Sequence, residues 1–194
     1  MEFVTFAEAL SLLRRLGVNK VTDAPNEMRF ELTDSPSVVV LDVAANDHVD
    51  IKSLPKEMRR VPRNAIANFV EALVHKMHLQ RTYVIPIGKW RQIFEAVSHG
   101  MVSSAAWRGV DTSASVELNT RDPLQFNLAD AHTLRDLIKV ILRDGRGIEH
   151  GITLCSDGAP LVIEVMPAGE MIIFAGRPDL AKQCEELLAH AKAD

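Results

Sequence analysis

The chain has 194 residues, of which 47 % are hydrophobic and 25 % are charged, and this composition is typical of a folded globular protein and excludes an intrinsically disordered one. Its formal net charge of −4 argues against a general nucleic-acid binder, which needs clustered basic surface to neutralise phosphates. No stretch approaches the roughly 20 apolar residues of a membrane-spanning helix, so we expect no membrane partner.

Two features of the sequence indicate in which cellular compartment the protein is found. Residues 1–17 carry Glu2 and Glu8, whereas a secretory signal peptide has positive charge followed by an unbroken apolar run. Cys155 and Cys184 are too few and too far apart for a disulfide scaffold or a zinc ribbon. Both features predict a cytoplasmic protein with reduced cysteines.

The first predicted element is a helix that begins at Thr5, where Thr5 and Glu8 fit a capping box, and ends at Gly17. Short segments rich in turn-forming residues then separate three strand-like runs. These runs cover residues 18–22, 27–33 and 37–44.

A second helix is predicted to begin at Pro62, because apolar residues recur at helical spacing from Ile66 to Met77. The run TYVIPIG at residues 82–88 predicts a strand. Because Pro86 cannot donate a hydrogen bond to a neighbouring strand, we expect this strand at an exposed edge of its sheet.

The rest of the chain is predicted to contain further helices and hairpins. A short helix covers residues 89–100, and the stretch 101–115, rich in Ser, Ala and Gly, predicts a linker or mobile loop. The later strands are predicted at residues 115–120, 124–128, 151–156, 160–166 and 170–175, and the later helices at 130–145 and 178–191.

The order of elements predicts an α+β fold of antiparallel sheets packed with helices. Residues 5–79 and 130–191 share the order helix, three strands, helix, which suggests two pseudo-repeated halves, 1–100 and 116–194, that pack separately or as one domain. The order over the first half resembles that of a small class of bacterial secretion chaperones, on element order alone. This resemblance implies a protein-binding, chaperone-like role.

The segment EALVHKMHLQR places Glu71, His75 and His78 on the face of the second helix opposite its apolar stripe. Residues three and four apart are neighbours on a helix, so the three side chains are candidates for a metal or catalytic site. The order of these residues differs from that of zinc proteases, and a solvated helix face with a Glu–His contact explains the pattern as well.

Arg59, Arg60 and Arg63 gather just before the same helix. Backbone N–H groups at a helix N-terminus favour anions, and arginines add paired donors, so this cluster is a candidate anion-binding site. A solvated basic loop is the alternative.

Trp107 and Arg108 lie together in the stretch predicted to be a loop, and this pair has the composition of an interaction hot spot. Burial of Trp107 in the core is the alternative. The sequence contains no P-loop, kinase signature or Cys-x-x-Cys pair, so we assign no catalytic residue and expect no cofactor.

These patterns favour a non-enzymatic binding or adaptor protein that contacts a protein partner or a second copy of itself, for example through the strand at 82–88. The alternatives are a small-molecule-binding or metal-dependent enzyme with a pocket between the two halves, and an anion-binding protein acting through Arg59, Arg60 and Arg63.

Overall fold

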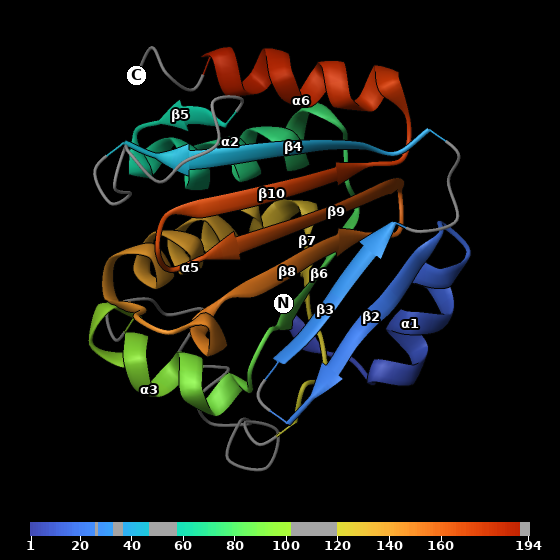
Figure 1. The fold of residues 1–194 in the computed structure, drawn as a ribbon. Coiled ribbons are helices and arrows are strands. Elements are labelled where there is room, and N and C mark those ends of the chain that lie inside the picture. The colour runs from blue at the N-terminus through green and yellow to red at the C-terminus, as the bar shows by residue number, and fades with distance from the viewer. Residues whose placement is uncertain (26, 33–36, 47–57, 102–119, 191–194) are drawn as a thin grey trace.

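The chain folds around an eight-stranded, mostly antiparallel sheet that has helices on one face and a two-stranded hairpin on the other (Figure 1). The computed structural model describes residues 1–25, 27–32, 37–46, 58–101 and 120–190. In spatial order the strands are β1 (Glu2–Phe3), β7 (Leu124–Asn127), β6 (Arg81–Pro86), β8 (Ile152–Ser156), β9 (Ala159–Met166), β10 (Glu170–Ala175), β4 (Val39–Ala45) and β5 (Arg59–Val61). Only β4 and β5 are parallel among these neighbours. The predicted α+β class is confirmed.

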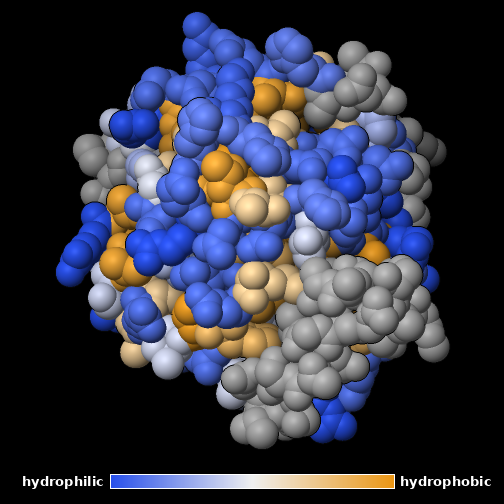
Figure 2. Space-filling view, turned by 180° about the vertical axis from the view of Figure 1, so that it is seen from behind, coloured by the Kyte–Doolittle hydropathy of each residue, from blue (hydrophilic) through white to orange (hydrophobic). Residues whose placement is uncertain are grey.

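The hairpin of β2 (Val18–Ala24) and β3 (Glu27–Leu32) lies with α1 (Phe6–Arg14) in front of the sheet in Figure 1, and this side is called the front face below. The other helices pack on the back face: α2 (Arg63–Lys76), α3 (Trp90–Met101), α5 (Ala131–Asp144) and α6 (Pro178–His190). Within the described ranges, none of the helices is long and apolar enough to cross a membrane. Seen from behind, the helical side is mostly hydrophilic, with separate hydrophobic patches (Figure 2).

Strand alternation divides the apolar residues between two cores. On β6, Tyr83 and Ile85 enter the front core beneath the hairpin, whereas Val84 enters the back core beneath the helices. On β9, Val162 lies in front and Ile163 behind. Because successive side chains of a strand point to opposite faces, a strand covered on both sides needs an almost continuous apolar run.

Several local predictions are confirmed. The hydroxyl of Thr5 accepts a hydrogen bond from the Glu8 backbone N–H at 3.3 Å at the start of α1. Gly17 follows that helix with a φ of 81°, a left-handed conformation that glycine adopts without steric cost. Asp130 is the residue before α5, as predicted. Its carboxylate, however, accepts a hydrogen bond from the Asn127 N–H at 3.1 Å and makes no capping hydrogen bond to the N–H groups of α5.

The expectation that TYVIPIG forms an exposed edge is wrong, because β6 lies between β7 and β8. Pairing with β7 ends at Val84, and the Ile87 N–H donates to Gly151 on the β8 side. Because successive backbone N–H groups of a strand point to opposite sides, the nitrogen of Pro86 points toward β7. At this position β6 is no longer paired with β7, so the missing N–H of proline costs no hydrogen bond.

The stretches 1–100 and 116–194 contribute strands to the same sheet, since β4 pairs with β10 and β6 pairs with β7 and β8. Their strands are also arranged differently. Strands β8, β9 and β10 are neighbours in the main sheet, whereas β2 and β3 form a sheet of their own. Of the predicted loop at 101–115, Met101 is the last residue of α3, and the remainder lies outside the described residues.

Candidate functional site

The predicted cluster on α2 is not assembled as a group. The Glu71 carboxylate accepts a hydrogen bond from Arg135 of α5 at 2.9 Å, and this contact ties the two helices together. His75 is exposed, and His78 lies beyond the helix end at Lys76 with a φ of 50°. Among the described residues, no three His, Cys, Asp or Glu side chains lie close enough to hold a metal ion. Because His78 lies outside the helix, the helical spacing that predicted its proximity to Glu71 and His75 does not hold.

The predicted arginine cluster is divided by the sheet. Arg59 lies 2.9 Å from Glu185 of α6 on the back face. Arg60 is the next residue of β5 and is exposed on the front face, because strand residues alternate. Arg63 donates to the Pro167 carbonyl at 3.1 Å. The three guanidinium groups therefore do not face one common anion. Trp107 and Arg108 lie outside the described residues.

An open, shallow hollow lies where α2 ends and β6 begins. Its volume is about 780 Å³, and its lining consists of His75, Gln80, Arg81, Asn127, Leu128 and Ala129. The guanidinium group of Arg81 donates to Asp157 at 2.6 Å, and Gln80 donates to the His78 carbonyl at 3.2 Å. Residues from both stretches of the chain thus line the hollow, and its surface combines polar side chains with a larger apolar part.

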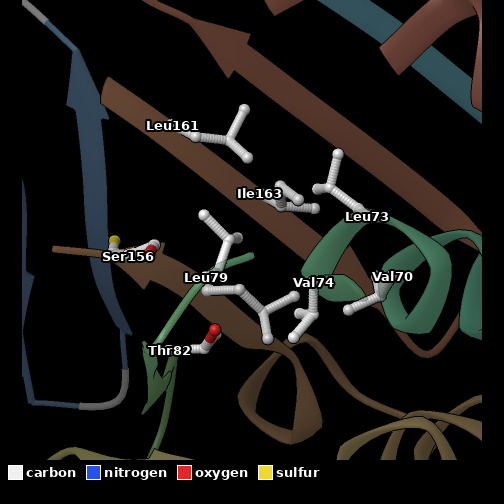
Figure 3. Close-up of a pocket in the computed structure, with 10 residues that line it drawn as sticks. Val70, Leu73, Val74, Leu79, Thr82, Ser156, Leu161 and Ile163 are labelled. Atoms are coloured by element: carbon white, nitrogen blue, oxygen red, sulfur yellow. The ribbon is translucent and has the colours of Figure 1, made fainter. Parts of the chain in front are cut away.

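A much smaller cavity lies beneath α2 (Figure 3). It measures about 10 Å³, and aliphatic side chains such as Leu73, Val74 and Leu79 line it. The hydroxyl of Thr82, whose residue is 4 % exposed, has no hydrogen-bond partner in the described part of the chain. A cavity of this size has room for at most one water molecule, so it is too small for an organic ligand.

The front face of the sheet is only partly covered. One cross-strand row runs from Tyr83 through Cys155, Val162 and Phe174 to Val40. The first three are buried beneath the hairpin, Phe174 is half-buried, and Val40 is 49 % exposed. Along this row the covering layer therefore ends between Val162 and Val40.

The next row runs from Ile85 through Thr153, Glu164 and Ile172 to Asp42. Ile172 is half-buried and Asp42 is exposed. We call the uncovered front-face positions of these two rows the front strip, and they are Val40, Asp42, Ile172 and Phe174.

Glu164 is a buried acid at the border of the front strip, with a side chain only 3 % exposed. Arg29 of β3 donates to its carboxylate at 2.9 Å and to Glu27 at 2.6 Å. Burial raises the pKa of Glu164 above its ordinary value of 4.5, the charge of Arg29 opposes this rise, and the neighbouring Glu31 and Glu27 add to it. The carboxyl group therefore resists ionisation although it has a cationic partner.

Thr153 lies directly across from Glu164 on β8 and is fully buried. Its hydroxyl also has no hydrogen-bond partner within the described ranges. Cross-strand neighbours point to the same face of a sheet, so Thr153 and Glu164 both face the front core.

No protein-family model, no curated protein and no solved structure matches this chain. The hollow and the front strip are therefore the two features of the described surface from which a function can be inferred.

Sequence reasoning missed both Glu164 and the front strip. One signal was available, because Glu164 interrupts the apolar run PLVIEVM in a strand whose faces are both covered. For Val40 the local signal was misleading, since the run SVVVLDVA is typical of a strand buried on both faces.

Proposed function

We propose that this chain is a non-enzymatic binding protein that holds a protein partner on its front strip. The observation that carries the proposal is the adjacency of the exposed Val40 to its direct cross-strand neighbour Phe174 and to Ile172 in the next row, both of which are half-buried. Single exposed apolar residues are ordinary, whereas neighbouring apolar residues that are partly exposed on a sheet face are typical of interaction sites.

The sequence also favours a non-enzymatic binding protein, but it indicates a different binding surface. A partner contacts the face of β10 and β4 instead of the β6 edge. Cys155 and Cys184 are both buried free thiols, which supports the cytoplasmic setting that we propose with this function.

Site-specific photo-crosslinking tests the proposal. A photo-crosslinking amino acid is placed at position 40 in the full chain, and matched controls carry it at positions 21 and 148. Val21 is 44 % exposed on the hairpin and Ile148 is 45 % exposed on the turn before β8, so both controls match Val40 in exposure. We expect a discrete protein adduct, identified by mass spectrometry, from position 40 alone. Equal adduct patterns from all three positions would contradict the proposal.

A second candidate function is the binding of a small polar ligand in the hollow at the end of α2. The observation that favours it is that His75, Arg81 and Asn127, which come from both stretches of the chain, line one hollow. Titration of the chain with inorganic phosphate, followed by NMR, tests this candidate. We expect phosphate to shift the NMR signals of these three residues alone, and we expect the Arg81→Gln variant to show no such shifts. If millimolar phosphate causes no shifts in the parent protein, the hollow does not bind this anion.

A further inference from the structure

In the part of the chain that the structure describes, the charges around the front strip are mainly negative. Asp42 lies within the strip, and Glu170 lies in the next row of β10. Glu27 and Glu31 are on β3, which packs against β9 and β10, and both acids act electrostatically on Glu164. Carboxylates therefore border the apolar surface on two sides.

Two guanidinium groups lie near these acids. Arg29 is already engaged by Glu27 and Glu164. Arg60 is exposed and lies beside Ala44, one strand further out than Glu170. Among the described residues, the carboxylates around the strip outnumber the cations, and the apolar residues lie between them.

We propose that the front strip binds a basic amphipathic segment of a partner protein. Apolar side chains of the segment pack on Val40, Ile172 and Phe174. Its Lys or Arg side chains then meet Asp42 and Glu170, since opposite charges across an interface favour association and exclude wrong partners. This inference rests on the proposed function and names the chemistry of the partner.

The same charges argue against other occupants. Two copies of the chain would bring two acidic strips together, and like charges across an interface are unfavourable. Nucleic acid and anionic lipid surfaces carry negative charge themselves and are repelled in the same way. A cationic protein segment is the occupant that satisfies both the apolar and the acidic residues.

Three synthetic peptides of equal length test the inference, one alternating Leu with Lys, one Leu with Gln and one Leu with Glu. Their affinities for the full chain are measured by fluorescence anisotropy at low and at physiological salt. We expect the Lys peptide to bind most tightly and the Glu peptide least. We also expect the preference for the Lys peptide to shrink as salt screens the charges.

Two pairs of variants locate the binding. Asp42→Lys should weaken the Lys peptide about tenfold, whereas Asp179→Lys, the same charge change at an exposed position on α6, should leave it unchanged. Val40→Lys should remove binding of both the Lys and the Gln peptide, whereas Val21→Lys should not.

The outcomes separate the two proposals. If the Lys and Gln peptides bind equally and both respond to Val40→Lys, the charge inference is overturned while the proposed function stands. If no peptide responds to Val40→Lys and position 40 forms no adduct, both are overturned.

Discussion

Arg29 on β3 and Glu164 on β9 form an ion pair, at 2.9 Å, that joins the hairpin to the main sheet across 135 residues of sequence. The acid is buried and the base is 25 % exposed, so the pair lies where the front core meets the open strip. The pair therefore connects the stability of the hairpin with the electrostatics of the proposed binding surface.

Replacing Arg29 with Ala should destabilise the protein at neutral pH, because the buried Glu164 loses its counter-ion. We expect a loss of about 2 kcal/mol in the free energy of unfolding. This is less than the roughly 3–5 kcal/mol of a fully buried pair, because water still reaches Arg29. Urea unfolding of both proteins measures the difference.

The double variant Arg29→Ala with Glu164→Gln is the control for this prediction. A neutral amide at position 164 needs no counter-ion, so the double variant should recover much of the lost stability. If it is no more stable than Arg29→Ala alone, the loss comes from packing of the arginine and not from its charge.

The raised pKa of Glu164 predicts a specific pH dependence of stability. Between the ordinary value of 4.5 and the higher folded value, the folded protein retains a proton that the unfolded chain has released. The contribution of Glu164 is therefore present below this window and is lost as the pH rises through it. Glu164→Gln should remove this fall, so the variant should gain stability relative to the parent as the pH increases.

Urea unfolding of parent and variant from about pH 5 to about pH 7 measures this difference. A stability difference between parent and Glu164→Gln that stays constant with pH would show that Glu164 has the same pKa in the folded and unfolded chain.

Thr82→Val should stabilise the protein by about 1 kcal/mol, because it replaces a buried hydroxyl that lacks a partner with a methyl group of similar size. The matched control is Ser156→Ala beside the same cavity. The Ser156 hydroxyl donates to the Arg81 carbonyl at 3.0 Å and accepts from the Gly158 N–H at 3.2 Å, so its removal should cost about 1 kcal/mol. Thermal unfolding measures whether each variant is more or less stable than the parent. A loss of stability in Thr82→Val would indicate that a bound water molecule hydrogen-bonds to the hydroxyl.

Both thiols should be inert in the folded protein. Burial raises the pKa of Cys184 to about 12, and burial together with the charge of Glu164 raises the pKa of Cys155 further. We expect a disulfide reagent such as DTNB to leave both cysteines unmodified at about pH 8 and to label both in concentrated urea. Rapid labelling of either thiol without denaturant would show that its core opens readily.

Local sequence patterns were sufficient to predict whether most of the described elements are helices or strands. The hydroxyl of Thr5 three residues before Glu8 specifies the start of α1, and the turn at Asp157 and Gly158 specifies the hairpin of β8 and β9. The apolar stripe that begins at Ile66 specifies α2 and the face that it buries. These signals act over a few residues, so they are present in the sequence itself.

The functional surfaces could not be predicted in the same way. Pro86 indicated an edge, yet its strand is interior, and Arg59 and Arg60 are adjacent in sequence but separated by the sheet. Which strand lies beside which depends on contacts between residues far apart in the chain. No local pattern records those contacts.

The sequence by itself therefore determined the α+β class, the helices and most of the strands among the described residues, and the residues suited to a core. The tertiary structure alone decided that the hairpin covers Val162 and leaves Val40 exposed, and that Arg29 reaches Glu164. The physical reason is that a side chain's tendency to be buried is a local property, whereas its actual exposure and its partners depend on how distant layers pack together.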